Sequence, residues 1–344
     1  MPPNERPVIA LTMGEPAGVG PEIVAKYLAG LKKSDFTLVV VGDQRLLRDA
    51  AAKFKFDIRK LNATSRPSRE KFAPDVPNFA SLKTVNLKDV EPGRPTAKTG
   101  RAAMAFVEKA TDLVMLHQVD AVVTAPISKK AINDAGYYFT GHTEYFANRT
   151  NTSKYAMCFL GDSLRVALVT SHYPLRKVHS KIKLARVIRT VFLFDEFLRK
   201  VGVKKPRIAV TGLNPHAGEN GLLGTEELHE IEPAVEACRV RGIDLDGPLS
   251  AEAAFHKHVG NKYDGVVAMY HDQGLVPLKI LLPYKTVNVT LGLPFVRTSV
   301  GHGVGLDIAG RGIAKIDSLR NAVNLAAKLV RAERPQLPKK RTSL

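Results

Sequence analysis

Three histidines in this sequence follow runs of apolar residues that predict buried strands. His172 lies in "VALVTSHYP", His216 in "IAVTGLNPHAGE" and His271 in "VVAMYHDQG". Neutral imidazole suits divalent transition metals, and three protein ligands with one open position are typical of a catalytic site. The separations of 44 and 55 residues match no short metal motif. On spacing alone, both interpretations stay open: metal ligands, or loop histidines with ordinary hydrogen bonds.

Groups that bind anions concentrate after the third of these strands. Lys279 follows the "HDQG" motif, and "VNVTLGLPFVRTSVGHG" contributes Asn288 and Arg297. Arg can bind a carboxylate or phosphate through two hydrogen bonds, and Lys adds a point charge. In "TGHTEYF", His142 and Thr143 are two further donors. The pattern favours an anion site over an ordinary surface loop with salt bridges.

The glycine-rich stretch "GEPAGVGPE" does not fit a phosphate-binding motif. A dinucleotide fingerprint requires a third glycine where this chain has Ile23, and the Gly-Lys-Ser/Thr of a phosphate loop is missing. The stretch therefore predicts a tight backbone turn near the site.

These residues need a scaffold, and the apolar pattern predicts an α/β sheet. Short β-branched runs alternate with helical patterns such as "PEIVAKYLAGL" and "TGRAAMAFVEKATDLVMLH". In wound sheets of this class, ligands bind beyond the carboxyl ends of the strands. Residues 55–98 predict irregular connections with a short strand at "LKTVNL". The last helix, "IDSLRNAVNLAAKLVRAE", precedes a basic tail that we expect to be disordered.

The formal net charge of +18 raises the question of an acidic partner. Much of the excess lies between Arg176 and Arg207, in a helical pattern whose charges favour a solvated face. We find no nucleic-acid reading module, so nucleic acid is not a favoured partner. Two distant cysteines, no apolar leader and no membrane-length apolar run favour the cytoplasm.

Six motifs in order carry a family resemblance. They are "TMGEPAGVGPE", "GHTE", "TSHYPL", "NPHAGE", "MYHDQG" and "NVTLGLPFVRTS" with the following "HG" and "LDIAG". The chain resembles the 4-hydroxythreonine-4-phosphate dehydrogenases, the PdxA family of pyridoxal phosphate synthesis. The resemblance implies an α/β fold with two α/β/α domains, similar to isocitrate and isopropylmalate dehydrogenases, and an active site in the interdomain cleft. We expect one domain from residues 1–134 plus 306–344 and a second from 135–305.

The resemblance also assigns roles to individual residues. It implies metal ligands at His172, His216 and His271. It implies substrate contacts at His142, Thr143, Lys279, Asn288 and Arg297, and cofactor contacts at Thr298, Gly301, His302 and Gly303. It implies catalytic or supporting roles for Lys279, Asp272 and Glu252, with Asp272 orienting an imidazole and Glu252 reaching the metal of a neighbouring subunit.

The implied reaction uses NAD or NADP and one divalent metal, which is zinc, magnesium or cobalt. The enzyme oxidises 4-phosphooxy-L-threonine to a β-keto acid that decarboxylates to 3-amino-2-oxopropyl phosphate. The family also implies a homodimer that shares its metal site across the interface.

Two departures from the family pattern affect substrate and cofactor detail. This chain has "SAEA" where the family commonly has "PADT", and "SVGHGVG" where it has "SVDHGTA". Glu252 and Gly301 thus each replace an Asp.

Four alternatives remain open. Relatives oxidise phosphorylated sugar acids, 4-phospho-D-threonate or 4-phospho-D-erythronate, and others oxidise aromatic cis-dihydrodiols. A dihydrodiol needs no phosphate anchor, so Lys279, Asn288 and Arg297 count against it. The others are a metal-dependent hydrolase and a nucleic-acid-binding protein on a defunct enzyme scaffold.

Overall fold

The structure is a computed structural model that describes residues 6–58, 61–64, 67–161 and 163–334. The strands of the first part are β1 (Val8–Thr12), β2 (Thr37–Gly42), β3 (Asn62–Thr64), β4 (Asn78–Ser81) and β5 (Ala121–Thr124). The helices of this part are α1 (Gly20–Ala29), α2 (Gln44–Lys53), α3 (Ala97–Met115), α4 (Lys129–Asp134) and α5 (His142–Arg149), with short turns η2 (Arg69–Lys71) and η3 (Leu87–Asp89).

The rest of the chain adds more strands than helices. The strands are β6 (Ala156–Leu160), β7 (Arg165–Leu168), β8 (Arg207–Thr211), β9 (Asp244–Leu249), β10 (Gly265–Ala268), β11 (Val287–Leu291) and β12 (Val296–Val300). The helices are α6 (Leu175–Lys181), α7 (Leu184–Lys200), α8 (Glu232–Arg239), α9 (Ala251–Val259), α10 (His271–Leu281) and α11 (Asp317–Glu333), with the turns η4 (Pro215–Gly221) and η5 (Glu227–Ile231).

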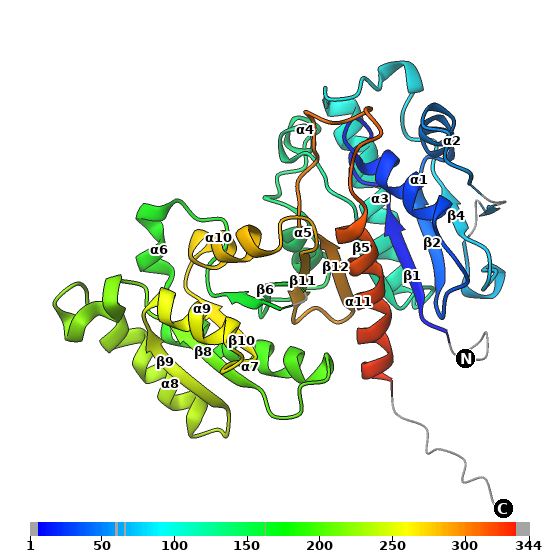
Figure 1. Ribbon diagram of the computed structural model, residues 1–344. Coiled ribbons are helices and arrows are strands. Elements are labelled where there is room, and N and C mark those ends of the chain that lie inside the picture. Colours follow the sequence, from blue (N-terminus) through cyan, green and yellow to red (C-terminus); the bar gives the residue numbers. More distant parts are fainter. Residues whose placement is uncertain (1–5, 59–60, 65–66, 162, 335–344) are drawn as a thin grey trace, which may run out of the picture.

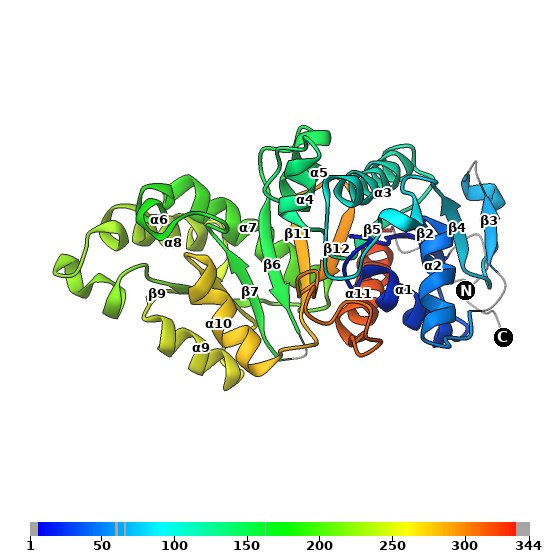
Figure 2. The same ribbon diagram turned by 90° about the horizontal axis from the view of Figure 1, so that it is seen from above.

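All strands belong to one 12-stranded sheet in the order β3-β4-β2-β1-β5-β12-β11-β6-β7-β10-β8-β9. The β3-to-β12 part and the β7-to-β9 part are each parallel, and the antiparallel strands β11 and β6 connect them. Figure 2 shows the sheet extending across the molecule with helices on both sides. The predicted α/β fold is confirmed, whereas the proposed domain boundaries stay a prediction.

Successive side chains of the central strands point to opposite faces of the sheet, and each face is covered by helices. Thr298 of β12 donates to the Ala322 carbonyl in α11, while Arg297 reaches Thr143 in α5 on the opposite face. In the other half, α9 and α10 pack on the face that carries Val166 and Val266. Apolar residues of α7, α8 and α11 belong to the larger core cluster. Burial on both faces explains why the parallel strands read as continuous apolar runs.

One prediction about an element was wrong. The segment "LKTVNL" is not a strand, and β4 lies immediately before it, where Phe79 is fully buried and Asn78 pairs with Val39 of β2. Asn78 bonds the backbone at Leu38, Ala73 and Val76, so an amide completes contacts that an apolar pattern does not reveal. The expected disorder of the basic tail concerns residues that lie mostly outside the described part.

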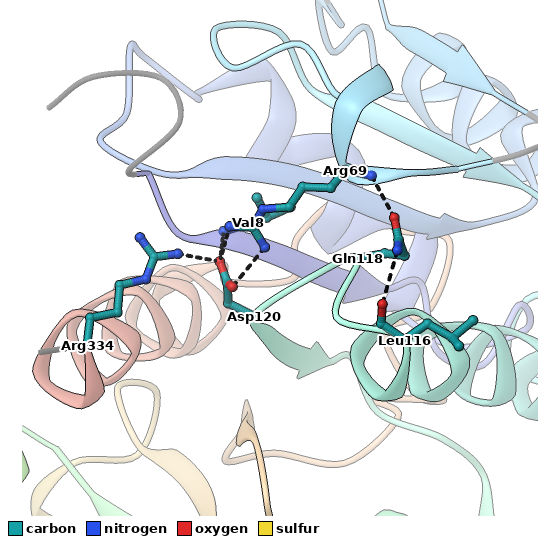
Figure 3. A network of polar contacts seen from close by, with 6 residues as sticks. All are labelled: Val8, Arg69, Leu116, Gln118, Asp120 and Arg334. Carbon is teal, nitrogen blue, oxygen red and sulfur yellow. Dashed lines mark hydrogen bonds and ion pairs between the residues drawn. The ribbon is translucent and has the colours of Figure 1, made fainter.

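Chain segments far apart in sequence meet at Asp120, in the turn before β5. Its carboxylate accepts from the Val8 backbone N–H at 2.7 Å, from Arg69 at 2.9 and 3.0 Å, and from Arg334 at 2.9 Å, and Figure 3 shows these contacts. The start of β1, the η2 turn and the end of α11 are thereby connected. No helix of the described ranges is long and apolar enough to cross a membrane.

Candidate active site

A cavity of about 330 Å³ lies over β12, β11 and β6, between the two parallel parts of the sheet. Loops after β5 and β12 form one side, and the residues that follow β7 and β10 form the other. Ten predicted site residues line it: His142, Thr143, His172, His271, Lys279, Asn288, Arg297, Gly301, His302 and Gly303. Figure 1 shows α5, which carries His142 and Thr143, close to β11 and β12, and Figure 2 shows α10, which carries His271 and Lys279, beside β7.

Arg297 is the most enclosed charge of this cavity, with a relative exposure of 2 %. One terminal nitrogen donates to Thr290 at 3.0 Å and, at longer range, to Asn288 and Thr143; the other donates to Thr124 at 2.7 Å. All four acceptors are neutral. Its Nε is buried without a partner within the described structure. A buried cation without a counter-ion is costly, so this arrangement favours an anionic ligand.

Two histidines of the cavity also present unpaired nitrogens. Nε2 of His142 and Nε2 of His302 are buried and have no partner among the described residues. The pKa of His142 lies well below its usual range because of burial and the charge of Arg297. Burial also lowers the pKa of His302, whose Nδ1 contacts the Gly303 carbonyl at 2.8 Å. Both rings are neutral at pH 7 and can hydrogen-bond a ligand.

The charge of the lining is predominantly positive. Lys129, Lys279 and Arg297 line the cavity, and Glu144 is its one carboxylate among the residues that the structure describes. Sequence reasoning missed Lys129 and Glu144. Lys129 follows a strand exit in "AVVTAPISKK", the context that singled out the histidines, and Glu144 ends the "GHTE" motif.

His172 and His271 form a pair at the opposite wall. Their ring centroids are 5.8 Å apart, and both rings line the cavity. Nδ1 of His271 lies 2.6 Å from Oδ1 of Asp272, so the carboxylate holds a proton there and leaves Nε2 free to bind a metal. Burial and the charge of Lys129 lower the pKa of His172, which favours its neutral, ligating form.

The Gln and the Gly of the "HDQG" motif fix the start of α10, where His271 lies. Gln273 accepts from Thr211 at 2.8 Å and from the Met269 N–H at 2.7 Å, and donates to the Gly212 carbonyl at 2.8 Å. The ends of β8 and β10 are thereby tied to the first turn of α10. A Cβ at Gly274 would lie 2.7 Å from a methyl group of Leu168, so this glycine permits close packing of α10 on the sheet.

His216 lies elsewhere in the chain. It begins five consecutive residues with φ between 44° and 81°, in the exposed η4 turn. The pKa of Glu252 is lowered, first by its own backbone N–H, then by the Ser250 side chain, and to a smaller extent by the charge of His216. Within the described ranges, no three His, Cys, Asp or Glu residues lie close enough to hold a metal. The predicted histidine triad therefore does not form within one chain.

Two predicted cofactor positions have specific local roles. The Thr298 hydroxyl donates to the Ala322 carbonyl at 2.8 Å and is fully buried toward α11, away from the cavity. The Gly301 N–H contacts the Thr286 carbonyl at 3.0 Å and Ser318 Oγ at 2.9 Å. A Cβ at position 301 would overlap Oγ1 of Thr286. Thr286 thus occupies the space that an Asp side chain at position 301 would need.

The turn "GEPAGVGPE" is a tight backbone turn, as predicted. Gly14 has a φ of 74°, and a Cβ there would lie 2.5 Å from the Pro126 carbonyl oxygen. The turn therefore packs against the loop after β5, and Pro126 of that loop lines the cavity.

Comparison with known proteins assigns this architecture to a family. Residues 34–326 match the family model of the pyridoxal phosphate biosynthetic protein PdxA. A D-threonate 4-phosphate dehydrogenase from Pectobacterium atrosepticum is 43% identical over 322 residues, covering 94% of this chain and 99% of the relative. A 4-hydroxythreonine-4-phosphate dehydrogenase from Desulforapulum autotrophicum is 42% identical over 328 residues, covering 94% and 96%.

A solved structure agrees with these sequence matches. The crystal structure of a 4-hydroxythreonine-4-phosphate dehydrogenase from Klebsiella pneumoniae has a TM-score of 0.82 and 40% sequence identity, covering 94% of this chain and 99% of that chain. The chain therefore belongs to the PdxA family, and it is a dehydrogenase.

Proposed function

We propose that this protein oxidises the hydroxyl group of a four-carbon, 4-phosphorylated hydroxy acid with NAD or NADP, in a divalent-metal-dependent reaction that ends in decarboxylation. The first candidate substrate is 4-phosphooxy-L-threonine, whose β-keto acid gives 3-amino-2-oxopropyl phosphate for pyridoxal phosphate synthesis. The relative from Desulforapulum autotrophicum carries the corresponding name.

The observation that carries this proposal is the environment of Arg297. A fully enclosed guanidinium has neutral partners and one unpaired nitrogen, while Lys279 and His142 line the same cavity. A phosphate or carboxylate matches the fork geometry of Arg and supplies the missing charge. Asn288 and Thr143 contact Arg297 and keep its guanidinium oriented.

The donor groups fit a divalent metal that is shared by two chains. His172 and His271 provide two imidazoles, and we propose that His216 of the partner subunit provides the third. His216 is exposed in its own chain, and Glu252 would accompany it. When bound, the metal would act as a Lewis acid toward the substrate oxygen during oxidation and decarboxylation.

The nicotinamide cofactor fits beside His302 and Gly303. His302 offers an unpaired Nε2, and a Cβ at Gly303 would meet nothing within 4 Å. The bound cofactor would accept the hydride from the substrate carbon.

The chain's own side chains bind and orient the substrate. Arg297 holds one anionic end, which fixes the reacting carbon relative to the histidine pair. Asp272 keeps Nδ1 of His271 protonated and its ring oriented. Lys279 either contacts the phosphate or supplies a proton after carbon dioxide leaves.

A phosphorylated sugar acid, 4-phospho-D-threonate or 4-phospho-D-erythronate, is the second candidate. Three cations and a single carboxylate line the cavity within the described residues, and a sugar acid has two anionic ends and no ammonium group. The relative from Pectobacterium atrosepticum is named for such a substrate. The same oxidation and decarboxylation apply to it.

The deciding experiment follows NADH or NADPH formation by absorbance with each of the three substrates, in the presence of zinc, magnesium or cobalt. We expect turnover of one substrate to exceed that of the others at least about tenfold, since one hydrogen bond in a closed site discriminates this strongly. The preferred substrate selects between the two candidates.

Controls address the rival reactions. Product formation without NAD or NADP would indicate a hydrolase, and unchanged turnover after complete metal removal would contradict the metal proposal. Salt-sensitive retention on RNA together with absent turnover would indicate a nucleic-acid-binding protein.

A further inference from the structure

A second cavity of about 390 Å³ adjoins the first. The two share the lining residues Thr140, Glu144, Met157 and His172, so they are contiguous. The second cavity is also lined by Arg186 and Arg189, from the first two turns of α7. These residues belong to the basic segment whose charges sequence reasoning placed on a solvated face.

The two arginines differ from the other basic residues of their helix. Neither forms an ion pair with a carboxylate in the described ranges of the chain. Arg199, on the same helix, forms two hydrogen bonds with Asp195 at 2.8 and 3.2 Å. Lys200 pairs with Glu196 at 2.9 Å and Glu333 at 2.8 Å. Two cations of α7 therefore lack carboxylate partners, and both line the cavity.

The contacts of the pair leave hydrogen-bonding capacity unused. Arg189 donates to the Ser153 carbonyl at 3.2 Å, and its Nε is buried without a partner within the described residues. The Arg186 guanidinium lies 5.8 Å from the centre of the Tyr173 ring. Burial lowers the pKa of Arg189, and the charge of Arg186 lowers it further. Two like charges three residues apart on a helix repel each other, and an anion between them would relieve this repulsion.

We propose that this cavity is a second oxyanion-binding site, formed by Arg186 and Arg189, which takes a phosphate or carboxylate group beside the catalytic cavity. The site extends beyond the proposed reaction and does not depend on it. Its oxyanion has two possible sources: the far end of the substrate, or a separate anion that binds together with the substrate.

The experiment titrates the full-length protein with inorganic phosphate by calorimetry, at about 0.15 M salt to screen the general positive charge. We expect the variant with Arg186→Met and Arg189→Met to lose one phosphate site per chain, or to bind at that site at least about tenfold more weakly. Arg199→Met, which removes a paired cation from the same helix, should bind like the wild type. Arg297→Met should still bind phosphate at the Arg186/Arg189 site. A loss of phosphate binding at this site can therefore be told apart from a failure of the proposed function, which depends on Arg297.

Two further arms complete the test. Phosphate binding at this site in the presence of saturating substrate would identify a separate anion, whereas competition would identify the far end of the substrate; both support the site. If the double variant does not fold, the single variant Arg186→Met is titrated with phosphate instead. Unchanged phosphate binding in a folded variant would overturn the proposal, because the arginines would then serve no anion. A smaller oligomeric state of the variant than of the wild type would also overturn it, because the arginines would then serve a subunit contact.

Discussion

Arg297 shows how a single residue can indicate the charge of a ligand. Thr290, Thr124, Asn288 and Thr143 supply neutral oxygens around its guanidinium. These oxygens satisfy its terminal nitrogens without neutralising its charge. Burial lowers the pKa of Arg297 to about 9, against an opposing effect of the Glu144 charge. An anion that enters the cavity would therefore offset much of the remaining cost of the buried cation.

We expect Arg297→Met to raise the KM for the phosphorylated substrate about 10-fold to 100-fold, because a charge-assisted hydrogen-bonding pair is lost. Arg297→Lys should recover only part of this, since Lys lacks the planar fork. Steady-state kinetics measure both. The exposed Arg199→Met is the control, and an unchanged KM in Arg297→Met would contradict the anchoring role.

Gly301 lies so close to Thr286 that a side chain at position 301 would overlap it. Restoring the family's acidic residue with Gly301→Asp should lower the free energy of unfolding by about 1–3 kcal/mol, because its Cβ overlaps Oγ1 of Thr286. Adding Thr286→Gly should recover part of the loss, and only part, since the Thr286 carbonyl also lies 2.6 Å from the Cβ position. Urea denaturation of the wild type, the two single variants and the double variant gives the coupling free energy between the two positions. Additive effects would show that the two positions are independent.

The sequence predicted many of the residues that line the cavity, but it did not predict what all of them contact. His142, Asn288 and Arg297 were found because donors cluster near strand exits and match family motifs. Thr298 was grouped with them, although strand alternation turns it toward α11. Gln273 was overlooked because its importance depends on contacts with β8, which is distant in sequence.

At the scale of elements, Asp120 fixes segments from both ends of the chain. Its carboxylate accepts hydrogen bonds from the first residue of β1, from η2 and from the residue after α11 (Figure 3). Its side chain is 21% exposed. The low solvent exposure makes these charge-assisted contacts stronger than ordinary surface ion pairs.

We therefore expect Asp120→Asn to lower the free energy of unfolding by about 1–2 kcal/mol, because the amide removes the charge that faces Arg69 and Arg334. Asp134→Asn is the matched control, since Asp134 forms an exposed i,i+4 pair with Lys130 and should change stability little. Chemical denaturation measures both variants. Equal effects would mean that the network adds nothing beyond a surface pair.

The elements themselves were predictable where their pattern was continuous. β1, β2, β5, β7, β8, β10 and β11 coincide with β-branched apolar runs. The direction of β11 and β6 was not predictable, because antiparallel pairing in the middle of the sheet is a tertiary property. Residues of the loops after β5 and β12 and residues that follow β7 and β10 nevertheless line a common cavity.

At the scale of the whole molecule, the predicted metal ligands lie in two places. His172 and His271 lie together, while His216 and Glu252 lie on a separate exposed part. Identical strand-exit contexts suggested that all three histidines converge, and β7, β10 and β8 are indeed neighbours in the sheet, but His216 lies beyond the end of β8 in the exposed η4 turn. Under the proposed function, a second chain brings His216 to the pair, which makes metal affinity dependent on protein concentration.

Stability should also depend on pH through histidines whose pKa values are lowered in the folded protein. The pKa values of His142, His172, His258 and His302 are all lowered, with burial as the largest cause. In each case the unfolded chain binds the proton more readily than the folded protein. Their contribution is therefore fully present above the unfolded pKa of about 6.5 and is lost as the pH falls below it.

His258 provides the clearest test of this pH dependence, because it lies outside the candidate site. Its Nδ1 contacts the Tyr263 carbonyl at 2.6 Å, and its Nε2 accepts from the Arg165 N–H at 3.2 Å. Protonation of Nε2 removes that acceptor, so the folded state resists it. We expect the free energy of unfolding to fall between about pH 7 and pH 5, and the fall to be smaller in His258→Gln, by up to about 1.4 kcal/mol per pH unit. Urea titrations across this range measure both slopes, and an identical slope in the variant would show that acid sensitivity arises at other groups.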